Sequence, residues 1–164
     1  MSLLKVVSGG QTGSDMAGLL AARIRGIETG GYIPKGFKTE RGPRPSLARW
    51  GLVETKSSGY IDRTKMNVEH SDATMIVSQN FESKGTILTE EAVRQYKKNC
   101  FKYVFFPPYQ PMKDEEIIER MADWIGECGA KTLNIAGNRE SVAPGLQFWL
   151  TSILMEVFTL TQAS

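Results

Sequence analysis

A short segment near the N-terminus combines glycines with hydroxyl and amide side chains. It reads Ser-Gly-Gly-Gln-Thr-Gly-Ser-Asp over residues 8–15, after the apolar residues 3–7 and before a helix-like run. Glycines let the backbone approach an anion, and the free N–H groups and positive dipole end of a following helix would face that anion. A tight turn capped by Ser14 or Asp15 is the alternative. We favour a phosphate-binding loop, because three glycines exceed what a turn needs. Its predicted ligand-binding residues are Gly9, Gly10, Gln11, Thr12, Gly13 and Asp15.

Two later junctions have a similar composition. Gly85 and Thr86 follow a strand predicted over residues 72–78, and Gly137 and Arg139 follow a strand predicted over residues 132–136. The N–H group of Gly85 and the hydroxyl of Thr86 could hold a phosphate oxygen, with an ordinary threonine helix cap as the alternative. Ligands of parallel sheets sit outside the carboxyl ends of the strands. Three such loops at one edge therefore favour a phosphate ligand more than any one loop alone.

Cationic side chains near these loops are candidates to neutralise phosphate. Arg63 and Asn67 lie four residues apart, so they share one face of a helix predicted over residues 60–68. Arg63 could contact an anion in bidentate fashion with Asn67 donating beside it, or both could belong to a solvent-facing polar stripe. Residues 34–50 are predicted to form an irregular basic loop, either solvated or acting as a lid from which Lys35 closes over an anion.

Strand-like and helix-like runs alternate along the chain, which is typical of a parallel sheet with helices on both faces. We expect Asp62 to cap the helix at 60–68, and Glu90 and Glu91 to lie in the first turn of a helix over 87–98. The aromatic run 101–106 predicts a central strand. The sequence therefore predicts an α/β fold: a single Rossmann-like domain over residues 1–164, doubly wound around a mainly parallel sheet. The expected strands are 3–7, 27–33, 52–55, 72–78, 101–106 and 132–136, and the expected helices 15–25, 60–68, 87–98, 113–126 and 144–160.

Composition restricts the classes of partner. The 164 residues carry 20 basic and 18 acidic side chains, and a net charge of +2 is too small to suggest nucleic acid or a membrane surface as partner. Cys100 and Cys128 form no spaced pair, and with His70 as the one histidine they do not suggest a zinc site. No apolar run approaches membrane-spanning length. We therefore expect a cytoplasmic protein with reduced thiols.

Motifs in a distinctive order cover nearly the whole chain: residues 8–15, 31–36, Tyr60 with Arg63 and Asn67, 71–74, Gly85 with Thr86, and 134–145. The sequence resembles the family named putative molybdenum carriers, which is related to the molybdenum-cofactor carrier proteins. That resemblance implies a phosphorylated ligand, such as the pterin monophosphate of the molybdenum cofactor or a nucleotide. It also implies a homo-oligomer and, because molybdenum would be carried inside the pterin, no direct protein ligands to metal.

The same family is similar in turn to Rossmann-like phosphoribohydrolases, which include cytokinin-activating enzymes formerly described as lysine decarboxylases. These enzymes carry an arginine on the helix before a strand, and a glycine-rich loop with a catalytic glutamate after it. Arg63 and Gly85-Thr86 look like parts of that pattern. Thr89 falls at the glutamate position, Glu90 comes one residue late, and Glu82-Ser83-Lys84 replace the first glycines. One residue turns a side chain by about 100° around a helix.

Two functions follow as hypotheses. The first is a carrier that binds a phosphorylated small molecule and needs no acid–base pair. The second is a nucleoside-monophosphate phosphoribohydrolase that cleaves the N-glycosidic bond, with Arg63 orienting the substrate and Glu90 as the carboxylate. Asp15 or Glu140 could replace Glu90 in that role. We favour the carrier, because no glutamate stands in register.

Overall fold

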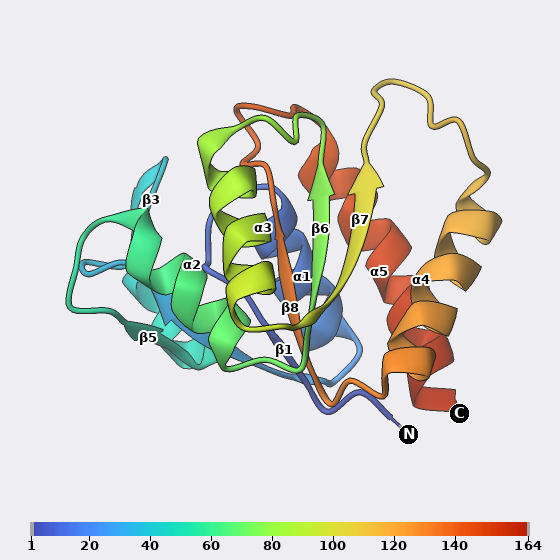
Figure 1. Ribbon diagram of the computed structural model, residues 1–164, viewed down its shortest axis with the longest axis horizontal. Helices are drawn as coiled ribbons and strands as arrows, with labels where there is room; N and C mark the ends of the chain where they lie inside the picture. The colour runs from blue at the N-terminus through green and yellow to red at the C-terminus, as the bar shows by residue number, and fades with distance from the viewer. Residues whose placement is uncertain (1, 164) are drawn as a thin grey trace.

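A six-stranded parallel sheet forms the centre of the computed structural model, which describes residues 2–163 (Figure 1). The strand order is β5-β2-β1-β8-β6-β7, and all neighbouring strands run parallel. In the register of the central strands, Val7 lies opposite Gly30 on one side and Asn134 on the other. The predicted Rossmann-like α/β fold is thus confirmed. The strands are β1 (Lys5–Val7), β2 (Glu28–Ile33), β5 (Leu52–Glu54), β6 (Ala73–Ser78), β7 (Asn99–Val104) and β8 (Thr132–Gly137).

Helices cover both faces of the sheet. On one face α1 (Ser14–Ile24) packs against α5 (Leu146–Ala163), and α5 packs against α4 (Asp114–Cys128). On the other face α2 (Tyr60–Glu69) packs beside α3 (Lys84–Gln95), in front of the sheet in Figure 1. Helix α4 buries an apolar stripe with the four-residue spacing of Ile117, Met121 and Ile125.

The segment 34–50 is ordered by secondary structure, so the prediction of an irregular loop was wrong. It forms a small antiparallel hairpin, β3 (Lys38–Thr39) with β4 (Gly42–Pro43), followed by the 3₁₀ helix η1 (Pro45–Trp50). Leu47 of η1 is 1% exposed and packs with Met16, Leu19 and Ile33. Leu47, with the partly buried Phe37 and Trp50 packed against the same cluster, thus anchors the segment beside β2 and α1.

Three local predictions also need correction. Helix α2 begins after Gly59 and has no side-chain cap, so Asp62 lies within its first turn instead of capping it. Helix α3 begins at Lys84, three residues before the predicted start, which places Glu90 and Glu91 beyond its first turn. The aromatic strand β7 pairs with β6 and is an edge strand. Its aromatic residues pack on α4 and α5 across the face of the sheet, so their burial does not require a second neighbouring strand.

No helix within residues 2–163 is long and apolar enough to cross a membrane.

Candidate functional site

A cavity of about 690 Å³ opens between α2 and α3, next to the ends of β1 and β8. Nine of the residues predicted for the site line it: Gly9, Gln11, Asp15, Arg63, Asn67, Gly85, Thr86, Gly137 and Arg139. The strand order brings them together, because β1 and β8 are neighbours and their following loops meet at one edge of the sheet. A volume of this size lies within the range of small-molecule sites.

Four predicted residues do not line the cavity. Gly10, with a φ of 72°, faces the apolar side chains of Ile33, Leu47 and Leu52, and a side chain there would meet them. Gly13 lies against the backbone of Asn138 and Arg139. Thr12 turns to the β3–β4 hairpin, and Lys35 is exposed after β2. The structure thus separates this part of the glycine loop from the cavity.

The amides of the glycine loop already have partners inside the protein. Gly10 N–H donates to Ser8 Oγ at 3.3 Å, and Thr12 N–H donates to Gln11 Oε1 at 3.0 Å. Gln11 N–H donates to the Asp15 carboxylate at 3.1 Å, and Gly13 N–H donates to Gln147 Oε1 at 2.9 Å. A phosphate at this loop would have to displace these acceptors, so a role for the amides in phosphate binding stays a prediction.

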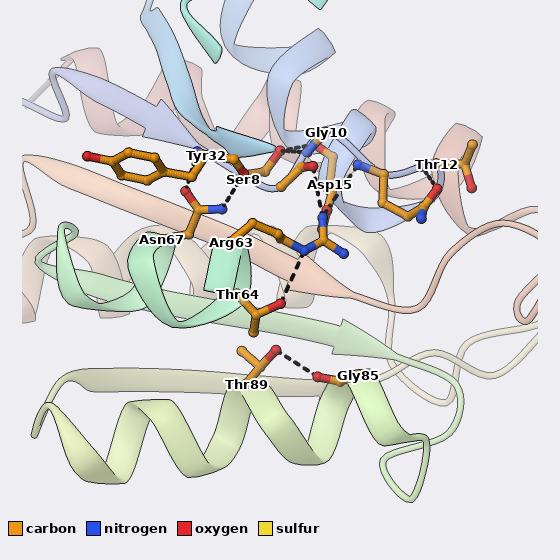
Figure 2. A network of polar contacts seen from close by, with 12 residues as sticks. Ser8, Gly10, Thr12, Asp15, Tyr32, Arg63, Thr64, Asn67, Gly85 and Thr89 are labelled. Carbon is orange, nitrogen blue, oxygen red and sulfur yellow. Dashed lines mark hydrogen bonds and ion pairs between the residues drawn. The ribbon is translucent and has the colours of Figure 1, made fainter. Parts of the chain in front are cut away.

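Arg63 reaches from α2 across to the loop after β1 (Figure 2). Its Nη1 donates to the carbonyl of Gly9 at 2.8 Å and lies 3.3 Å from Asp15 Oδ2, while its Nε donates to Thr64 Oγ1 at 3.1 Å. The guanidinium carbon lies 4.9 Å from the centre of the Tyr60 ring, a cation–π contact. Among the described residues, Nη2 has no hydrogen-bond acceptor, so one edge of the guanidinium is available to a ligand.

Asp15 is the buried carboxylate of the cavity. Burial raises its pKa to about 6, against the opposing effects of the Arg63 charge and of N–H groups of Gln11 and Gly9. Desolvation therefore outweighs a direct ion pair at this position. A carboxyl that titrates near neutral pH inside a cavity can exchange a proton under physiological conditions.

Two positively charged side chains, Arg63 and Arg139, line this cavity and repel each other. Burial is the largest cause lowering the pKa of Arg63, and the charge of Arg139 lowers it further, whereas Asp15 and Tyr60 raise it. Arg139 is itself half exposed and lies 3.6 Å from Glu40 of the hairpin. An anion between the two arginines would relieve their mutual repulsion.

The side-chain amide of Asn67 is hydrogen-bonded to the backbone of β2. Its Oδ1 accepts the N–H of Tyr32 at 2.8 Å, and its Nδ2 donates to the carbonyl of Tyr32 at 2.9 Å. The prediction that Asn67 donates to a ligand would require breaking this two-bond clamp on β2. Figure 2 shows Asn67 turned to Tyr32 and away from Arg63.

The N-terminal turn of α3 forms the opposite wall of the cavity. Ser83 to Thr86 line it, and the helix has no side-chain cap, so its positive dipole end faces the cavity. The Thr86 hydroxyl is not available as predicted, because it is hydrogen-bonded to Ser78 at 3.0 Å and accepts from Ser83 at 2.9 Å. Asn138 ties this turn to the loop after β8, because its Nδ2 donates to Ser83 Oγ at 3.1 Å. Its Oδ1 accepts the N–H groups of Gln79 and Asn80 in the segment after β6.

Both acidic alternatives to Asp15 have other partners. Glu90 lies 3.2 Å from Lys102 on β7 and is not among the residues that line the cavity. Thr89 does line it, and the next residue on a helix points about 100° away. Glu140 accepts the N–H groups of Gly145 and Gln147, both at 2.9 Å, at the start of α5. Of the three carboxylates considered from the sequence, only Asp15 faces the cavity.

Sequence reasoning missed several lining residues. Tyr60, Thr64, Lys84, Asn134 and Asn138 line the cavity without having been predicted for the site. Tyr60 lies one helical turn before Arg63, a spacing that signals a shared helix face. Asn134 lies inside β8 and Asn138 just after it, so polar side chains interrupting a buried central strand were the available signal.

Comparison with known proteins agrees with this architecture. No curated protein matches the chain. Among solved structures, the chain is similar to the crystal structure of a protein from Syntrophus aciditrophicus SB named "putative molybdenum carrier protein". The two share 36% sequence identity and a TM-score of 0.85, over 96% of this chain and 95% of the other. Residues 6–158 match the circularly permutated YpsA SLOG family. The resemblance to molybdenum carriers is therefore confirmed, and the chain belongs to the circularly permutated YpsA SLOG family.

Proposed function

We propose that this protein is a carrier that binds a phosphorylated small molecule, a nucleotide or a pterin monophosphate, in the cavity between α2 and α3. The observation that carries the proposal is the free edge of Arg63: a largely buried guanidinium lines the cavity while Nη2 has no acceptor among the described residues. Guanidinium pairs with phosphate through strong charge-assisted hydrogen bonds.

The charges around the cavity favour a dianion. Three cations line it, Arg63, Arg139 and Lys84, against two carboxylates, Asp15 and Glu91. Asp15 offsets part of the Arg63 charge, but Arg139 and the N-terminal turn of α3 add positive potential on the other sides. A phosphate monoester placed between these groups would relieve the repulsion between the arginines and replace the water that solvates the uncapped turn.

A carrier role fits the structural relative named as a putative molybdenum carrier. In this chain the cargo would be a pterin phosphate with molybdenum attached to the pterin, and the protein would hold the organic part. Within residues 2–163 no cluster of three His, Cys, Asp or Glu side chains could hold a metal ion. Absence of direct metal ligands stays a prediction, which the metal content of the loaded protein can test.

Isothermal titration with AMP and with inorganic phosphate tests the proposal. Arg139→Ala is a suitable variant, because Arg139 is half exposed and its removal leaves the Arg63–Asp15 pair intact. We expect it to weaken AMP binding about tenfold, the value of one partly exposed charge-assisted hydrogen bond. Arg120→Ala, which removes a surface arginine paired with Glu116, is the matched control. Lack of AMP and phosphate binding at millimolar concentration, or equal affinities of Arg139→Ala and wild type, would contradict the proposal.

Asp15 favours a second function, hydrolysis of a nucleoside monophosphate. It is a buried carboxyl in the cavity with a pKa of about 6, close to the pH at which a general acid or base works best. Water would add across the N-glycosidic bond, giving the free base and ribose 5-phosphate, with Asp15 taking the proton of the attacking water. In this alternative Asp15 replaces Glu90, whose partner Lys102 lies on β7.

A further inference from the structure

Three aliphatic side chains line the cavity while remaining unusually exposed. Ile61 is 57% exposed, Ile87 41% and Val142 38%. They come from three separate elements: α2, α3 and the segment between β8 and α5. Single exposed aliphatic residues are common on protein surfaces, but exposed apolar groups gathered at one cavity indicate a binding surface.

Two kinds of side chain line the cavity. We call Arg63, Arg139 and Lys84 its cationic part, and the exposed Ile61, Ile87 and Val142 its apolar part. Helices α2 and α3 pack side by side on the same face of the sheet, so Ile61 and Ile87 approach the cavity from its two helical walls. Two aliphatic walls suit a flat ring, which contacts each wall with one face.

The size of the cavity agrees with a ligand that has two parts. A volume of about 690 Å³ exceeds what a sugar phosphate fills, and a phosphate held at the cationic part would leave the aliphatic side chains in water. The Tyr60 ring already contacts two cations, Arg63 with its guanidinium carbon 4.9 Å and Lys38 with its Nζ 5.2 Å from the ring centre. The exposed aliphatic residues are therefore the groups left to contact the ring of a ligand.

We propose that Ile61, Ile87 and Val142 form an apolar clamp that selects phosphates bearing a flat, uncharged ring over sugar phosphates and inorganic phosphate. The clamp residues are specificity-determining and contact the ring, while Arg63, Arg139 and α3 hold the phosphate. This inference rests on the proposed function, since it assigns the second half of the same ligand. The ring expected at the apolar part is a nucleobase or a pterin, or one of similar shape.

The test is isothermal titration of the full chain with AMP and ribose 5-phosphate, two probes that differ by the base. Wild-type protein is expected to bind AMP at least about tenfold more tightly than ribose 5-phosphate, as burial of the aliphatic groups by a ring predicts. Ile61→Ser and Ile87→Ser should each weaken AMP binding about fivefold, with ribose 5-phosphate binding unchanged within about twofold. Ile24→Ser is the matched control, because Ile24 is 56% exposed at the end of α1 and does not line the cavity.

The possible failures separate the two proposals. Binding of neither probe would overturn the proposed function and the clamp together. Equal affinities for AMP and ribose 5-phosphate would leave the phosphate site standing and overturn the clamp. Equal losses for both probes in Ile61→Ser would show a merely structural effect and also overturn the clamp. A third probe, octyl phosphate, overturns the flat-ring assignment if it binds more tightly than AMP.

Discussion

Replacing Asp15 by asparagine tests whether desolvation outweighs the charge of Arg63 in setting the pKa of the Asp15 carboxyl. Burial raises the pKa of this carboxyl from its ordinary 3.8 to about 6, although Arg63 lies 3.3 Å away. The native state therefore binds a proton more tightly than the unfolded chain, and the contribution of Asp15 to stability falls as pH rises from 3.8 to 6. At about 1.36 kcal/mol per pH unit, the full loss amounts to about 3 kcal/mol.

The Asp15→Asn variant lacks this titration but keeps an oxygen to accept the N–H of Gln11. The variant has no carboxylate beside Arg63 at any pH, so this site adds no pH dependence to its stability between pH 4 and 7. The free energy of unfolding of wild type minus that of the variant should therefore fall by about 2.5 kcal/mol from pH 4 to pH 7, because most of the titration lies in that range.

Urea unfolding of both proteins at pH 4, 5, 6 and 7 measures this difference. Glu116→Gln, a change at an exposed carboxylate paired with Arg120, is the control and should show no comparable pH dependence. A difference that stays constant from pH 4 to 7 would refute the reasoning that desolvation governs Asp15. A difference that rises with pH would show that the Arg63 ion pair outweighs desolvation.

Three further predictions concern the surroundings of the cavity. Leu47→Ala should destabilise the protein by about 2–5 kcal/mol in urea unfolding, since Leu47 is 1% exposed beneath Gly10, and a loss under 1 kcal/mol would contradict its anchoring role. Asn67→Ala removes both hydrogen bonds to Tyr32 and should cost about 1–3 kcal/mol by the same assay, with faster hydrogen exchange of the Tyr32 amide as the local signature. Glu90→Gln should change stability by no more than about 0.5 kcal/mol and leave AMP affinity unchanged, because its partner Lys102 is a largely exposed residue.

The fold was predictable because its signals are local and repeated. Alternating apolar runs and amphipathic helices predict a parallel sheet without any knowledge of long-range contacts, and Gly9, Gly85 and Gly137 of the three glycine-containing loops line one cavity beside that sheet. The edge position of β7 was not predictable from its aromatic composition, because helices can bury aromatic residues as well as strands can.

The detailed roles of the site residues depend on contacts far apart in the sequence. The side chain of Gln147, 134 positions later in the sequence, accepts a hydrogen bond from the N–H of Gly13. Glu40 accepts hydrogen bonds from the hydroxyls of Thr12 and Ser141. Burial opposes the charge of Glu40, but hydrogen bonds from Ser141 and Thr12, with the nearby charge of Arg139, hold the pKa of Glu40 below its usual range. Composition alone made the glycine loop look like a phosphate cradle, whereas these partners already occupy its donors.

A phosphorus NMR time course of the purified protein with near-stoichiometric AMP tests most directly whether the protein binds a phosphorylated ligand without cleaving it. The proposed carrier predicts a broadened or shifted AMP signal that persists without new signals, and restoration of the free AMP signal on adding excess inorganic phosphate. Growth of a ribose 5-phosphate signal would instead assign the hydrolase, with loss of that growth in Asp15→Asn. An AMP spectrum identical with and without the protein would contradict nucleotide binding in the cavity.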